Sequence, residues 1–180
     1  MTLSEPHESP IPAAGVRLSI DIGRDAENLL TGASRSGMDG ALAALTTFYC
    51  GFNGADADLL REVWAEADKV RLMNPVGGVL DGADEVAALY ARIFTGGVRV
   101  WVAYSDVTAY MAGDMVVFAG RERGEFQPRT DDGGGSPLPL SIRTSRIFAY
   151  IDGRWRQVHH HGSIDDAELL AKYQAAVRGT

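Results

Sequence analysis

Residues 145–163, SRIFAYIDGRWRQVHHHGS, decide the fold because they join two strand patterns through a tight turn. Asp152-Gly153 is a strong hairpin signal, since both central residues of a type I′ turn need positive φ and these residue types tolerate it. Apolar and polar residues alternate on both sides of the turn, as in half-buried strands. The stretch therefore predicts a β-hairpin.

The period of two along a strand assigns the side chains of this hairpin to two faces. Arg146 is the single charged residue on a face that comprises Leu138, Leu140, Ile142, Thr144, Arg146, Phe148 and Tyr150. After the turn, one face carries Trp155, Gln157, His159, His161 and Ser163, and the opposite face carries Arg154, Arg156, Val158 and His160. We therefore expect His159 and His161 to point the same way and His160 to point the other way.

Length and composition indicate one α+β domain with a sizeable core. The chain has 180 residues, of which 46% are hydrophobic, and glycine-rich turns separate its strand patterns. The formal net charge of −7 argues against nucleic acid and anionic membranes as partners, because both attract basic surfaces. A single cysteine, Cys50, cannot form an internal disulfide, and no apolar run approaches the length of a membrane span. We expect a cytoplasmic protein.

The remaining segments predict the order of the other elements. Residues 1–37 form a separate N-terminal region: a proline-containing tail over 1–14, then an alternating pattern from Val16 to Ile22 that predicts an added edge strand or an arm exchanged with a second subunit. Residues 38–180 form the main domain. Periodicity and turn signals predict helices over 38–52, 56–64 and 165–178, a further helix capped by Asp81, strands over 69–74, 98–111 and 115–126, and a flexible loop over 129–137.

The hairpin also resembles a known family. Its pattern of a small hydroxyl residue, Arg, an apolar and an aromatic residue, then Asp-Gly-basic-Trp and Val-His-x-His-x-Ser, is similar to the closing hairpin of the calcium/calmodulin-dependent protein kinase II association domain and of SnoaL-like proteins. Both belong to the nuclear transport factor 2-like superfamily, together with ketosteroid isomerase and scytalone dehydratase. The resemblance covers residues 38–178. It implies a cone, in which a strongly curved mixed or antiparallel sheet wraps round three helices and encloses a pocket.

Ketosteroid isomerases carry their general base, an aspartate, immediately before Pro-Val-Gly. Here MNPVGG places Asn74 at that position, and an amide cannot abstract a proton at neutral pH. Asn74 is thus either a pocket residue that orients a carbonyl or a water, or a turn residue. Tyr49 lies near the position of the isomerase oxyanion-hole phenol, where it is either catalytic or part of the core. The aspartic acid that supplies the second oxyanion donor has no counterpart.

Arg146 matches an arginine that lines the association-domain pocket, where the resemblance implies binding of small carboxylates. A permanently charged group on an apolar face needs such a partner, or else an ion pair with Glu122 or Asp106. Both alternatives remain open. We expect Arg146, Asn74, Trp64, Phe148 and Glu122 to contact the ligand.

The run His159-His160-His161 does not predict a metal site. In a strand, at most two of the three side chains converge on one ion, and no further Cys or His completes a set. We expect neither a metal nor an organic cofactor. His159 and His161 are instead candidates for general acid–base catalysis, because an unperturbed imidazole has a pKa of ~6.5. The alternative is hydrogen bonding within the sheet.

Two classes of function follow from these residues. One is an isomerase, cyclase, dehydratase or epoxide-opening enzyme that acts on an apolar oxygenated metabolite. The other is a binding or assembly module without catalysis, in which Arg146 only captures a carboxylate. In either case we expect a homodimer or higher oligomer through the outer face of the long strands, because Trp101 and Tyr104 lie on opposite faces and one helix layer cannot cover both.

Overall fold

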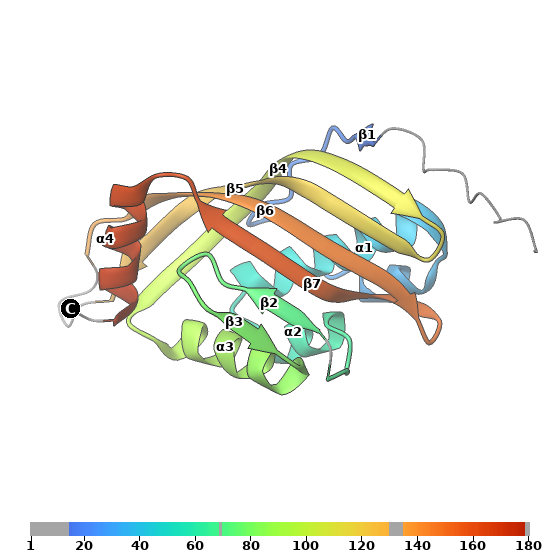
Figure 1. Ribbon diagram of the computed structural model, residues 1–180, viewed down its shortest axis with the longest axis horizontal. Helices are drawn as coiled ribbons and strands as arrows, with labels where there is room; N and C mark the ends of the chain where they lie inside the picture. Colours follow the sequence, from blue (N-terminus) through green and yellow to red (C-terminus); the bar gives the residue numbers. More distant parts are fainter. Residues whose placement is uncertain (1–14, 69, 130–134, 179–180) are drawn as a thin grey trace, which may run out of the picture.

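The computed structural model of the protein describes residues 15–68, 70–129 and 135–178. The strands are β1 (Val16–Arg17), β2 (Arg71–Met73), β3 (Val79–Asp81), β4 (Val98–Ala112), β5 (Met115–Pro128), β6 (Leu138–Ile151) and β7 (Arg154–Ile164). The helices are α1 (Gly37–Asn53), α2 (Ala57–Val63), α3 (Ala83–Thr95) and α4 (Ala167–Arg178), with a 3-10 helix over Leu30–Ser34 (Figure 1). The predicted tail over 1–14 and most of the predicted flexible loop lie outside the described residues.

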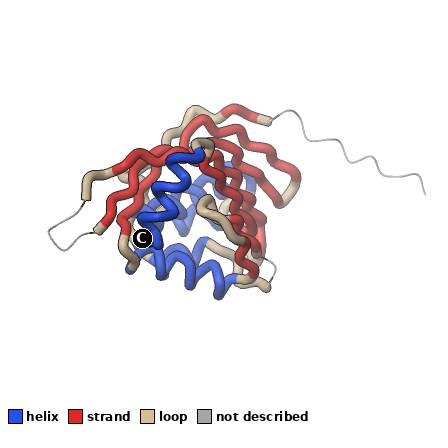
Figure 2. Tube along the Cα trace, turned by 60° about the vertical axis from the view of Figure 1, so that its left-hand side comes forward, coloured by secondary structure: helices blue, strands red, loops and turns tan. Residues whose placement is uncertain are grey.

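The strands form one curved sheet of seven strands in the order β1-β4-β5-β6-β7-β2-β3. Neighbouring strands are antiparallel, except that β2 and β7 run parallel. Figure 2 shows the sheet arching over the helices, so that its concave face and the helices enclose the core. The predicted α+β cone is confirmed. Among the described residues, no helix has the length and apolar character needed to cross a membrane.

A β-bulge in β7 changes the predicted faces of the hairpin. Ile147 pairs with His159 and the next residue, Phe148, pairs with Gln157, so Val158 is an extra residue in β7. An extra residue reverses the alternation beyond it. His160 therefore lies on the inward face, where it is buried, whereas His161 is exposed. His159 and His161 do point the opposite way from His160, as expected, but the bulge places His160, and not His159 and His161, on the buried face of Trp155 and Gln157.

The helix starts follow local side-chain chemistry. Asp56 caps α2 as its oxygen accepts a hydrogen bond from the Leu59 backbone N–H at 2.9 Å. The predicted cap of α3 was wrong: Asp81 ends β3 and pairs with Arg71 at 2.6 Å, and Gly82 occupies the cap position with φ of 86°. Only glycine adopts that conformation without strain, which lets the chain turn directly from β3 into α3.

Both ends of the described chain join the cone. β1 pairs with β4, and Ile22 forms a further bridge to Tyr104, so the N-terminal strand is an edge strand of its own sheet. At the other end, α4 lies across one end of the sheet (Figure 1). The Tyr173 ring packs on Phe126 with ring centroids 4.7 Å apart, and the Gln174 side chain donates to the Val76 carbonyl at 2.8 Å. The amphipathic C-terminal helix therefore docks on the cone.

Candidate functional site

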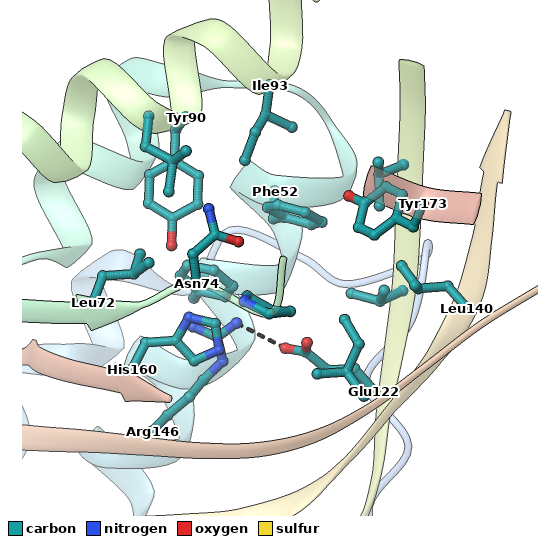
Figure 3. A pocket seen from close by; sticks show the side chains of 16 residues that line it. Phe52, Leu72, Asn74, Tyr90, Ile93, Glu122, Leu140, Arg146, His160 and Tyr173 are labelled. Atoms are coloured by element: carbon teal, nitrogen blue, oxygen red, sulfur yellow. Dashed lines mark hydrogen bonds and ion pairs between the residues drawn. The ribbon is translucent and has the colours of Figure 1, made fainter. Parts of the chain in front are cut away.

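A cavity of about 60 Å³ lies between α1, α3 and the concave face of the sheet, next to Tyr173 of α4 (Figure 3). This volume holds a few waters or a small organic group, at ~10–15 Å³ per water. Most of its wall is aromatic or aliphatic. The polar side chains in the wall are Asn74, Tyr90, Glu122, Arg146, His160 and Tyr173.

Arg146 and Glu122 form a buried ion pair at one end of the cavity. Nη2 of Arg146 donates to Oε1 of Glu122 at 2.7 Å, and both side chains are less than 5% exposed. The Tyr49 hydroxyl donates to the same carboxylate oxygen at 2.7 Å and accepts a hydrogen bond from Nε of Arg146 at 3.0 Å. Nη1 of Arg146 donates to Oε1 of Gln157 at 3.3 Å. All three nitrogens of the guanidinium are thus engaged.

The surroundings keep Arg146 charged despite its burial. The guanidinium carbon lies 3.7 Å from the centroid of the Phe48 ring, which is a cation–π contact. Burial opposes the charge, but the negative Glu122 and the phenol groups of Tyr49 and Tyr90 raise the pKa of Arg146 overall. Of the two predicted ion-pair partners, Glu122 is present; Asp106 instead pairs with Arg123 at 2.8 Å and Arg17 at 3.2 Å.

His160 projects into the cavity from β7, beside Arg146 (Figure 3). The residue is only 5% exposed, and neither Nδ1 nor Nε2 has a hydrogen-bond partner among the described residues. Burial holds the pKa of His160 well below its usual value, and the positive Arg146 lowers it further. His160 is therefore a neutral imidazole that offers one donor and one acceptor to the contents of the cavity.

Tyr90 of α3 provides a second polar group without a partner. Its hydroxyl points toward the end of the cavity where His160 and Arg146 lie (Figure 3). Burial raises the pKa of Tyr90 to about 12, while the nearby Arg146 and Trp64 side chains act in the opposite direction. Although these groups lie close, the hydroxyl makes no hydrogen bond of acceptable geometry within the described part of the chain. It is a neutral phenol, available as a donor.

Asn74 combines the two alternatives that the sequence left open. Its Oδ1 accepts a hydrogen bond from the Val76 backbone N–H at 3.1 Å, which is a turn function, and its side chain also lines the cavity. Asn74 follows β2, the strand that pairs with the histidine segment of β7. In this pairing Leu72 lies opposite His160, and Asn74 follows two residues after Leu72.

The other predicted site residues divide into two groups. Glu122 and Arg146 line the cavity as expected, whereas Tyr49 is buried behind them and reaches the cavity only through their hydrogen bonds. Trp64 and Phe148 are buried outside its lining: Trp64 packs near Tyr90 with ring centroids 6.5 Å apart, and Phe148 packs on Phe118. Neither side chain lines this cavity, so their contact with a ligand stays a prediction.

His159 and His161 also lie outside the lining of the cavity, because the bulge at Val158 turns them outward. The residues that sequence reasoning missed are His160 and Tyr90. His160 was excluded by strict alternation, and Tyr90 was assigned only to the buried stripe of its helix. Among the residues that the structure describes, no three His, Cys, Asp or Glu side chains gather in a way that would hold a metal ion.

Comparison with known proteins agrees with this geometry. A SnoaL-like domain matches residues 41–167. The chain belongs to the SnoaL-like family. The match includes α3 and the hairpin, and so contains both Tyr90 and His160. No curated protein matches the chain.

Solved structures share the fold of this chain. A proposed dehydratase of the NTF2-like family from Streptomyces avermitilis is 24% identical, with a TM-score of 0.60 over 69% of this chain and 93% of that one. A proposed calcium/calmodulin-dependent protein kinase type II association domain from Thiobacillus denitrificans is 25% identical, with a TM-score of 0.54 over 69% and 94%. A ketosteroid isomerase-like protein from Erwinia carotovora is 19% identical, with a TM-score of 0.58 over 70% and 94%. The first and third show the fold alone.

Proposed function

We propose that this SnoaL-like protein is an acid–base enzyme that isomerises or dehydrates a metabolite whose neutral, carbonyl-bearing part enters the cavity. The observation that carries the proposal is His160, a buried neutral imidazole that lines the cavity with neither ring nitrogen hydrogen-bonded to a described residue. A buried polar group without a partner costs about 1–3 kcal/mol, so such groups usually bond to a ligand or to an ordered water.

His160 and Tyr90 have complementary roles in this proposal. The free imidazole nitrogen of His160 accepts a proton from the carbon next to the carbonyl. The Tyr90 hydroxyl donates a hydrogen bond to the carbonyl oxygen, on which negative charge develops as the proton leaves. Return of this proton from His160 to another carbon gives an isomer. Its transfer to a hydroxyl group on the neighbouring carbon, with cleavage of the C–O bond, releases water and gives dehydration. The Arg146–Glu122 ion pair forms the part of the cavity wall next to His160 and Tyr90, and as a pair it adds no net charge.

The alternative is a binding module in which Arg146 captures a carboxylate, as the resemblance to the kinase association domain implies. The contacts of Arg146 favour this less, because Glu122 already compensates its charge and all three guanidinium nitrogens have acceptors. An anionic ligand at this end of the cavity would also lie near the Glu122 carboxylate. The electrostatics of the cavity therefore favour a neutral group of the substrate at this position.

Exchange of ketone protons in heavy water tests the proposal without knowledge of the substrate. The protein is incubated with a panel of small linear and cyclic ketones, and incorporation of deuterium next to the carbonyl is followed by NMR. We expect the wild type to accelerate exchange for part of the panel and His160→Gln to lower the rate by about 10²–10⁴-fold. Tyr90→Phe should lower it as well.

His161→Gln is the matched control, since it makes the same change three residues from the bulge on the outward face, and it should leave the exchange rate unchanged. Equal rates for His160→Gln and the wild type would refute the catalytic role. So would the absence of acceleration for every ketone in the panel.

A further inference from the structure

A second hollow adjoins the cavity at the end of the cone. It is a groove of about 720 Å³ between the ends of α1 and α3, the first residues of β4 and the end of β5. Phe52, Ile93 and Val100 line both the groove and the cavity. A single layer of side chains thus separates the two hollows.

The groove is rich in positive charge, although the chain as a whole carries a net charge of −7. Three arginines line it, Arg24, Arg99 and Arg129, and all three are exposed to solvent. The one carboxylate in its described lining is Glu125, which accepts a hydrogen bond from the Trp101 indole at 3.3 Å. This excess of guanidinium groups attracts anions.

Two of the arginines are held in place by the fold. The guanidinium carbon of Arg24 lies 4.0 Å from the centroid of the Trp101 ring. Arg129 donates from Nη2 to the Phe94 carbonyl at 2.9 Å, and its backbone N–H donates to the Gly97 carbonyl at 2.7 Å. Stacked or anchored guanidinium groups lose less conformational entropy when they bind a ligand.

The edge of β4 borders the groove. Tyr104 pairs with Ile22, and Val102 pairs through its N–H and C=O with the Asn53 side chain at 3.0 and 2.9 Å. Alternation along the strand directs the peptide groups of Val100 to the same edge. Val100 is one of the residues that line the groove.

We propose that the groove binds the anionic end, a carboxylate or a phosphate, of the same substrate whose neutral carbonyl end enters the cavity. This inference rests on the proposed acid–base function. The cavity alone has room only for a small group, so the remainder of a longer substrate has to lie in the adjoining hollow. Arg24 lies outside residues 41–167, the part that matches the SnoaL-like family, whereas Arg99 and Arg129 lie within it.

Binding of inorganic phosphate and of acetate tests the groove by itself. The anions are titrated into the wild type at constant ionic strength against sodium chloride, and the indole N–H signal of Trp101 is followed by NMR. We expect a saturable shift with at least one anion, and an affinity about fivefold or more lower in Arg24→Ala and Arg99→Ala. Arg61→Ala, an exposed arginine that pairs with Asp84 away from the groove, is the charge-matched control and should bind like the wild type. The better ligand distinguishes phosphate from carboxylate substrates.

Oxo acids of increasing chain length test whether groove and cavity serve one substrate. We expect an oxo acid of suitable length to bind about tenfold tighter than its methyl ester, and Arg99→Ala to abolish that difference. Equal binding of acid and ester would refute the shared substrate, and a Trp101 signal that responds to phosphate and acetate no more than to chloride would refute the anion site.

The two proposals fail in different ways. Phosphate binding does not involve His160, so His160→Gln should retain it. If the acid–base proposal is wrong, the protein accelerates exchange for no ketone in the panel, but phosphate or acetate still shifts the Trp101 signal.

Discussion

Replacement of Arg146 by leucine tests the buried ion pair most directly. Glu122 is 3% exposed, so in Arg146→Leu its buried carboxylate loses its cation, and Gln157 loses a donor to its side-chain oxygen. Removal of one partner of a buried pair typically destabilises a protein by about 3–5 kcal/mol. We expect a loss of that size in the free energy of unfolding, measured by urea denaturation with circular dichroism.

Arg143→Leu is the matched control, because Arg143 lies on the same strand, pairs with Asp165 and has a side chain that is 62% exposed. An exposed pair contributes about 0–1 kcal/mol, so this variant should stay close to the wild type. Glu122→Gln in the Arg146→Leu background removes the stranded charge and should recover about 1–3 kcal/mol. If Arg146→Leu were no less stable than Arg143→Leu, the pair would not stabilise the fold and the guanidinium would be free for a ligand.

Two further predictions concern pH and assembly. Burial keeps His160 unprotonated in the folded state, whereas the unfolded chain binds a proton there below pH ~6.5, so stability falls as the pH falls. The wild type should lose about 1.4 kcal/mol per pH unit more than His160→Gln below this pH, and parallel curves from urea unfolding would contradict it. We also expect copies to associate through the outer face of β4–β7, where Tyr110 and Met115 are 48% and 47% exposed. Met115→Glu should then lower the mass seen by light scattering, and a monomeric wild type at micromolar concentration would refute the association.

The hairpin shows which structural features were readable from the sequence. The Asp152-Gly153 turn and the uninterrupted period of β6 placed Arg146 on the buried face correctly, because nothing disturbs the alternation between Leu138 and Phe148. Alternation along a strand shows on which face Arg146 lies, but it does not identify the carboxylate with which Arg146 pairs. The choice between Glu122 and Asp106 therefore required the structure, in which Glu122 on β5 turns inward beside Arg146.

The acid–base residues show where sequence reasoning fails. The residues around Val158 fit a regular strand as well as a bulged one, so the sequence does not reveal the bulge. The bulge nevertheless moves every following side chain of β7 to the face opposite the one that strict alternation predicts. Tyr90 lies at an ordinary apolar position of an amphipathic helix, so its spacing indicates packing. Its lack of a hydrogen-bond partner becomes visible only when the neighbouring side chains are placed.

The register between β2 and β7 relates these residues to the isomerase resemblance. In that resemblance the general base stands at the position of Asn74, which here carries an amide. Leu72, two residues earlier in the chain, lies opposite His160 on the adjacent parallel strand, so both side chains border the same cavity. A base on β7 beside that strand would reach a substrate in the same apolar cavity, although from a different direction. Within the SnoaL-like fold, loss of the carboxylate after β2 is therefore compatible with acid–base catalysis, provided that the bulge holds His160 inward.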